Sequence, residues 1–117
     1  YENLLEGDLY GGYVTTISKN STVPIQVNLT DSIKDMIQDG VSIMTFFGHS
    51  SANYTDVSIG YPSDYIFKPG RYPLMIVNGC FSGDIYTTGA ASISEDFVLA
   101  EGKGAIGCGH WWWGKDY

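Results

Sequence analysis

Basic residues are scarce in this chain of 117 residues. Six Lys and Arg stand against 13 Asp and Glu, which gives a formal net charge of −7. Phosphate binding requires clustered Lys and Arg, so the sequence argues against nucleic acid as a partner. No apolar stretch approaches the length of a transmembrane helix, so no membrane-spanning segment is predicted.

Cysteine and histidine are also few, with two of each. Cys80 and Cys108 are expected to be free, because each lies at a predicted strand end inside Gly-rich sequence; a single disulfide between them is the alternative. Two Cys and two His at these spacings match no standard zinc site, and no Walker-type phosphate loop is present. These absences predict no metal site, and the chemistry suggested below requires no cofactor.

The chain opens at Tyr1 without an initiating Met, so we interpret it as a mature product or as a fragment of a longer protein. A missing signal peptide therefore says nothing about secretion. Hydrophobic residues make up 44% and charged residues 16% of the chain, which is an ordinary globular balance. The length is enough for one small domain, or for part of a larger one.

Residues 1–24 are expected to be an irregular lead-in with a β-like stretch at 13–17, and residues 25–29 alternate as a half-buried strand does. Thr30 is a good N-cap for a helix over 31–39, which Gly40 closes. The rest of the chain, 25–117, carries three predicted buried strands, a long loop, and a helix that starts at a Ser92–Glu95 capping box. The strands are expected at 41–47, 73–77 and 104–108, the loop at 50–71, and the helix up to about residue 101.

This order of elements is typical of an α/β fold whose parallel strands are joined by right-handed crossovers. Three strands leave an exposed sheet edge, so something should cover it. We therefore expect that the chain lacks a partner segment, namely the remaining part of its own parent chain.

Two reactive side chains follow directly on two of these apolar runs. His49 follows Phe46-Phe47-Gly48, and Cys80 follows Val77-Asn78-Gly79. If both runs are parallel strands of one sheet, both residues lie at the same edge, where ligands gather in open α/β sheets. A thiol and an imidazole at that edge suggest a cysteine nucleophile with its base. The alternative is structural, because a lone Cys after a strand is commonly a small buried residue.

Around His49 and Cys80 the chain resembles the gingipain family of cysteine peptidases, relatives of caspases and legumain with the caspase-hemoglobinase fold. The resemblance lies in 44–51, Met-Thr-Phe-Phe-Gly-His-Ser-Ser, and in 74–84, Leu-Met-Ile-Val-Asn-Gly-Cys-Phe-Ser-Gly-Asp. It extends over about residues 25–117. It implies a three-layer α/β/α sandwich with a mainly parallel sheet, of which this chain would be the C-terminal part.

By this resemblance Cys80 is the nucleophile of a cysteine endopeptidase and His49 its acid and base. The amides of Ser50 and Cys80 would form the oxyanion hole, although Ser50 stands where the family usually has Gly. Asp116 lies where some relatives have an acidic residue near the pocket for the P1 side chain, and would select Arg or Lys. Trp113 would wall that pocket. The alternatives are a solvated terminal Asp116 and a Trp113 that packs in a core.

The resemblance also implies a bacterial protein that is secreted or attached to the cell surface, with a protein or peptide as its substrate. Structural calcium is compatible with loop carboxylates such as Asp56, Asp64 and Asp84, although no EF-hand spacing is present. Cys108 is expected to be a small buried residue, and His110 a surface or supporting histidine. Two other functions stay open: a sortase-like transpeptidase that processes secreted proteins, and a non-catalytic binding module of the same fold.

Overall fold

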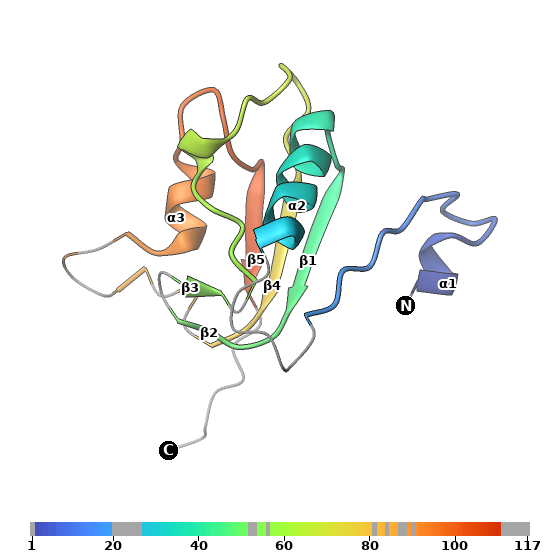
Figure 1. The fold of residues 1–117 in the computed structure, drawn as a ribbon, viewed down its shortest axis with the longest axis horizontal. Helices are drawn as coiled ribbons and strands as arrows, with labels where there is room; N and C mark the ends of the chain where they lie inside the picture. The colour runs from blue at the N-terminus through green and yellow to red at the C-terminus, as the bar shows by residue number, and fades with distance from the viewer. Residues whose placement is uncertain are drawn as a thin grey trace.

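The computed structural model describes residues 2–19, 27–51, 54–55, 57–80, 82–83, 85–86, 89 and 91–110. Within them the chain forms a small α/β fold, drawn in Figure 1. Its elements are α1 (Glu2–Leu5), α2 (Val27–Asp39), β1 (Ile43–Phe47), β2 (Ser50–Ser51), β3 (Tyr54–Thr55), η1 (Pro62–Asp64), β4 (Leu74–Asn78), α3 (Ile93–Val98) and β5 (Gly107–His110).

The main sheet of the described residues has three strands in the order β1-β4-β5, and both pairings are parallel. The register aligns Phe47 with Asn78 and Val77 with His110. The predicted α/β class and parallel sheet are therefore confirmed. Because the strands are parallel, their carboxyl ends lie together at the lower end of the sheet in Figure 1.

One face of this sheet holds the core. Met75 and Val77 of β4 are 3% exposed and belong to one buried cluster with Ile37 of α2 and Phe97 of α3. Side chains two apart in a strand point to the same face, so both helices cover the same side of the sheet. Burying this face is what stabilises the fold, because apolar surface contributes about 25 cal/mol for each Å² removed from water.

The opposite face of the sheet is apolar and open among the described residues. Ile43 is 50%, Phe47 65% and Leu74 36% exposed. The apolar runs predict buried strands, but β1 and β4 are buried on one face only. A short apolar run does not reveal whether a second layer covers it, which explains the difference. The two layers are consistent with part of a caspase-hemoglobinase-like α/β/α domain.

Helix α2 begins earlier than the sequence analysis predicts. Residues 27–29, expected to be strand, are helical, and Thr30 lies inside the helix instead of capping it. An alternation over only five residues does not separate a strand from the first turn of a helix, so the prediction was wrong there. The stop at Gly40 is confirmed: its φ is 101°, and Arg71 packs against it.

Helix α3 has the predicted capping box. The Ser92 amide donates to Glu95 Oε2 over 2.7 Å, and the Glu95 amide donates to Ser92 Oγ over 3.4 Å. The helix ends at Val98, shorter than predicted, and β5 starts at residue 107 instead of 104. Gly104 has a φ of 84° and lies against the Phe97 carbonyl, to which the Ala105 amide donates over 2.8 Å. Residues 104–105 therefore bind the end of α3 before the strand can begin.

The start of the chain does not form the expected strand at 13–17. Among residues 2–19, the helical turn α1 and the residue after it bind this segment through side chains: the Val14 amide donates to the Glu6 carboxylate, and the Thr16 hydroxyl donates to the Glu2 carboxylate. A β-like run becomes a strand only when another backbone pairs with it, and the sequence does not show whether one is available.

The connection from β1 to β4 was predicted to be a loop, but parts of it are ordered elements. The short hairpin β2–β3 follows His49 directly, and η1 comes after it. Tyr65 is 1% exposed, and its ring lies 5.5 Å from that of Phe67 and 6.1 Å from that of Phe97. This aromatic cluster anchors the connection on the core. None of the described helices has the length and apolarity needed to cross a membrane.

Candidate active site

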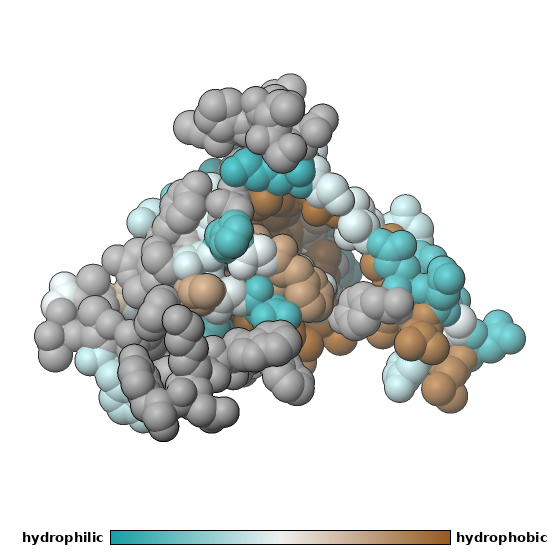
Figure 2. Space-filling model, turned by 90° about the horizontal axis from the view of Figure 1, so that it is seen from below, coloured by the Kyte–Doolittle hydropathy of each residue, from teal (hydrophilic) through white to brown (hydrophobic). Residues whose placement is uncertain are grey.

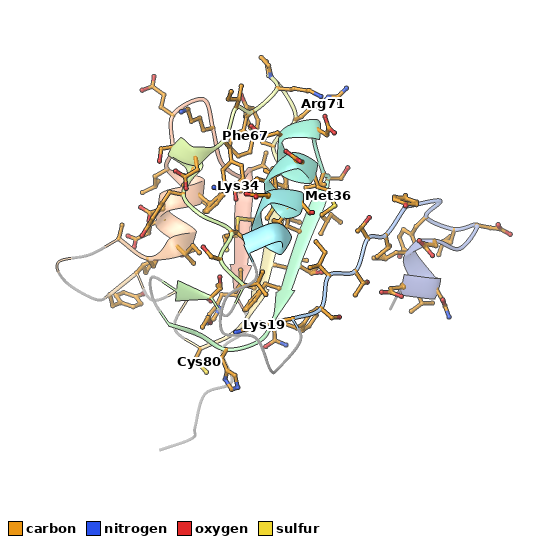
Figure 3. All side chains as sticks on the ribbon, viewed as in Figure 1. Lys19, Lys34, Met36, Phe67, Arg71 and Cys80 are labelled. Atoms are coloured by element: carbon orange, nitrogen blue, oxygen red, sulfur yellow. The ribbon has the colours of Figure 1, made fainter. Side chains whose placement is uncertain are left out.

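His49 and Cys80 occupy equivalent positions beyond two neighbouring strands. Phe47 and Asn78 are partners in the β1–β4 register, and each reactive residue comes two positions later. The ladder continues one step further, because the Gly48 amide donates to the Asn78 carbonyl over 3.3 Å. Figure 3 shows Cys80 at the lower end of the sheet, where β4 ends. The fold therefore brings both residues to one edge.

The loops that carry these residues touch each other. The Ser50 hydroxyl donates a hydrogen bond of 2.8 Å to the Cys80 carbonyl. A Cβ added at Gly79 would collide with Ser50 Oγ and would lie 3.0 Å from the Gly48 carbonyl oxygen. Glycine at 79 is thus what permits this close approach. We call residues 79–80 and 82–83 the Cys80 turn; Phe81, between them, lies outside the described residues.

The two cysteines have different surroundings. Cys80 and His49 are exposed to solvent, as a group that must meet a substrate requires. Cys108 is half-buried in β5, where it packs against the core, and burial raises the pKa of its thiol. Both thiols are free. The prediction of free cysteines is confirmed, whereas Cys108, expected to be buried, is only half-buried, because it packs at the margin of the core.

His110, expected to be a surface or supporting histidine, ends β5 and contacts the Cys80 turn. Its Nδ1 lies 3.2 Å from Ser82 Oγ, and Ser82 is only 1% exposed. A Cβ added at Gly83 would lie 2.9 Å from the His110 Cβ and Cγ. The imidazole therefore packs directly against the turn two to three residues after Cys80.

An apolar groove lies beside this edge, along β1. It has a volume of about 1550 Å³ and runs between residues 12–19, α2 and β1, as far as Gly48 and Val57. Neither His49 nor Cys80 is among its described lining residues. Figure 2 views the protein from the carboxyl ends of the strands and shows hydrophobic residues beside the polar ones near the centre. The groove borders the candidate site but does not contain it.

The two predicted specificity residues, Asp116 and Trp113, lie outside the described residues, as do Asp56 and Asp84. The third loop carboxylate considered for calcium, Asp64, accepts a hydrogen bond of 2.8 Å from the Tyr61 amide and so caps the start of η1. The described part of the chain contains no group of three or more His, Cys, Asp or Glu able to hold a metal ion. Structural calcium stays a prediction, and no step of the proposed reaction uses it.

Sequence reasoning missed two contacts at this edge, the Ser50 hydroxyl with Cys80 and Ser82 with His110. Each joins residues 28 or 30 positions apart. The glycines before and after Cys80 were the available signal, because small residues mark places where other chain segments approach closely. Nothing in the sequence indicates which side chains approach.

A thiol and an imidazole at the carboxyl edge of a parallel sheet are the arrangement of an α/β enzyme that uses a cysteine nucleophile. Comparison with known families specifies the class further. The family model of Peptidase family C25 matches residues 5–109, and the chain belongs to this family, that of the gingipains. The match begins nearer the start of the chain than residue 25, so the lead-in is part of the family region.

Membership of Peptidase family C25 points to peptidase activity of the cysteine type. The match ends at residue 109 and therefore does not bear on Asp116 or Trp113. A search of curated proteins found no match, and neither did a search of solved structures.

Proposed function

We propose that this protein is a cysteine endopeptidase in which Cys80 is the nucleophile and His49 the acid and base. The observation that carries the proposal is the register: Phe47 pairs with Asn78, so His49 and Cys80 each lie two residues beyond the end of adjacent strands. Adjacent strands lie about 5 Å apart, so side chains at these positions can reach one peptide carbonyl. Family membership supports the same assignment.

In the proposed reaction, His49 accepts the proton of the Cys80 thiol, and the thiolate attacks the carbonyl carbon of the scissile bond. The tetrahedral intermediate collapses to a thioester, and the leaving amine takes the proton from His49. A water molecule, deprotonated by His49, then attacks the thioester and releases the acid product and the Cys80 thiol. Thiol and imidazole provide every group that these steps need, so no cofactor takes part.

The amides of Ser50 and Cys80 are the proposed donors to the oxyanion. Support comes from the hydrogen bond of 2.8 Å between the Ser50 hydroxyl and the Cys80 carbonyl, which holds the two residues together. The Ser50 side chain lies against Gly79, since a Cβ built there would be 3.0 Å from the Ser50 Cβ. The serine that replaces the usual glycine is thus accommodated by Gly79.

We further propose that Asp116, with Trp113 beside it, selects Arg or Lys at P1, because a carboxylate would bind either cation through a charge-assisted hydrogen bond. The substrate would be a protein or peptide, encountered outside a bacterial cell or at its surface. Support for Asp116 and Trp113 comes from the resemblance of the sequence to gingipains, and support for the location comes from the family.

The first test is hydrolysis of a fluorogenic peptide library by the full-length protein, with Cys80→Ala as the comparison. Cleavage that disappears in the variant supports a cysteine peptidase, and the preferred P1 residue tests Asp116. Cleavage that persists in the variant overturns the assignment of Cys80.

No cleavage by either protein, with the fold intact by circular dichroism, calls for a second assay with an added amine acceptor. A new amide product would identify a transpeptidase. Without such a product, labelling by a thiol-reactive probe distinguishes an enzyme from a non-catalytic module. Equal and slow labelling of Cys80 and Cys108, unchanged by His49→Ala, indicates the non-catalytic module.

A further inference from the structure

We infer that Ser50 and His110 are positioning residues that hold the Cys80 turn from the two neighbouring strands. The inference rests on the proposed function and extends it, because neither side chain is given a chemical step there. Ser50 follows β1 and His110 ends β5, so they reach the turn from opposite sides of β4.

On the β1 side, Ser50 fixes the backbone of the nucleophile itself. Its hydroxyl donates to the Cys80 carbonyl over 2.8 Å, across 30 residues of sequence. This close contact is possible because Gly79 has no side chain: a Cβ at that position would collide with Ser50 Oγ. The direction of the Cys80 carbonyl is therefore set by the side chain of the residue that follows His49.

On the β5 side, His110 fixes the residues that follow. Ser82, which is 1% exposed, has its hydroxyl oxygen 3.2 Å from His110 Nδ1. The imidazole also lies against Gly83, since a Cβ there would come within 2.9 Å of the His110 Cγ. A buried hydroxyl needs a hydrogen-bond partner, so the contact stabilises one conformation of the turn.

Cys80 lies between these two anchors and is itself exposed. Exposure lets the substrate approach, but it leaves the thiol with little packing of its own to hold it in place. The angle of attack and the direction of the Cys80 amide then depend on the turn, and misplacement by about 1 Å can cost about 100-fold in rate. Both residues should therefore act on kcat, while KM depends on contacts elsewhere.

The test compares Ser50→Ala, His110→Ala and His110→Asn in the full-length protein, with Ser63→Ala as the matched control. Ser50→Ala keeps the backbone amide and removes only the hydroxyl. The amide group of Asn can occupy the place of Nδ1 and bind Ser82. Ser63 is an exposed serine of η1, outside the site. Each variant is measured for kcat and KM on the best peptide substrate and for its melting temperature.

We expect Ser50→Ala and His110→Ala each to lower kcat about tenfold, with KM changed less than about twofold. His110→Asn should recover most of the lost rate, and Ser63→Ala should match the wild type. Unchanged kcat in both alanine variants of an active protein overturns the inference. So does a loss that follows melting temperature alone and that Asn does not recover.

Amide hydrogen exchange separates this inference from the proposed function. Ser50→Ala and His110→Ala should speed exchange in the Cys80 turn and leave β4 unchanged, whether or not the protein cleaves peptides. Faster exchange in a protein without peptidase activity would support the positioning role of Ser50 and His110 and contradict the proposed function. Unchanged exchange in the Cys80 turn would contradict the positioning role of Ser50 and His110.

Discussion

The carboxyl edge of the sheet and its helix-covered face use the same residue types in opposite ways. At the edge, Cys80 is exposed, follows a strand and is held through its backbone by Ser50. On the covered face, Cys108 lies within a strand and packs against the core. The comparison teaches that a position two residues past a strand end gives a side chain access to substrate, whereas a position inside the ladder gives it a place in the core. Substitutions at the carboxyl edge should therefore change activity, and substitutions on the covered face should change stability.

The largest expected effect is at the edge. Cys80→Ala should lower kcat/KM at least about 10⁴-fold, because no other group replaces a missing nucleophile. Its melting temperature should stay within about 2 °C of the wild type, since truncation of an exposed side chain leaves packing intact. Peptide hydrolysis and calorimetry measure the two. Cys108→Ala is the control from the covered face. Equal loss of activity in both variants would contradict the distinction between a functional edge and a structural face.

Phe97 provides the matching effect on the covered face. Its side chain is fully buried beneath Tyr65 and against β4 and β5. Phe97→Ala should lower the free energy of unfolding by about 3–5 kcal/mol, because it removes apolar contact and leaves a cavity. Denaturant unfolding measures this change. Val98, next in α3 and 41% exposed, gives the control variant Val98→Ala, and a similar loss there would mean that α3 packs through another face.

Tyr65 sharpens the comparison inside the core. Its hydroxyl is buried, and no described residue partners it. Burial raises the pKa of this phenol, and the nearby Asp64 adds to the shift. Tyr65→Phe should increase stability by about 1 kcal/mol, since it removes a polar atom that lost its hydrogen bonds to water. Unfolding in denaturant tests this, with Tyr72→Phe as the comparison. A loss of stability would show that the hydroxyl has a partner.

The smallest expected effect is the contribution of Cys108 to the pH dependence of the free energy of unfolding. Burial raises the pKa of its thiol in the folded chain, so the folded state favours the protonated form. Its contribution to stability is complete below the unfolded pKa and is lost as the pH rises through the folded value. As the pH rises above about 8.5, the ordinary pKa of a thiol, wild type should therefore lose stability relative to Cys108→Ala.

Unfolding free energies of the two proteins at each pH test this prediction. A constant difference between them would mean that the Cys108 thiol does not titrate differently in the folded chain. Alkylation gives a second measurement, because at a given pH Cys108 should form less thiolate than an ordinary cysteine and react slowly.

Local signals in the sequence predicted the elements that depend on near neighbours. The Ser92–Glu95 capping box and the stop at Gly40 both formed as expected, because each satisfies backbone groups within one turn of helix. The apolar runs before His49 and Cys80 became β1 and β4 close to the predicted bounds. Their parallel direction followed from the α/β pattern.

Elements whose form depends on distant partners were predicted less well. Residues 13–17 have β character but bind the side chains of Glu2 in α1 and of Glu6 just after it, instead of another strand. β5 starts late because residues 104–105 bind the end of α3. A propensity describes one segment, whereas strand pairing and helix docking depend on which other segment is near.

The sequence by itself determined that a histidine and a cysteine each come just beyond a strand, and that glycines surround the cysteine, because both facts depend on residues close together in the chain. Only the tertiary structure decided that Ser50 bonds to Cys80, that His110 contacts Ser82, and that the described residues leave one face of the sheet open. These contacts join residues 28 or 30 positions apart. They are set by strand register and loop path, which a local pattern of residues does not specify.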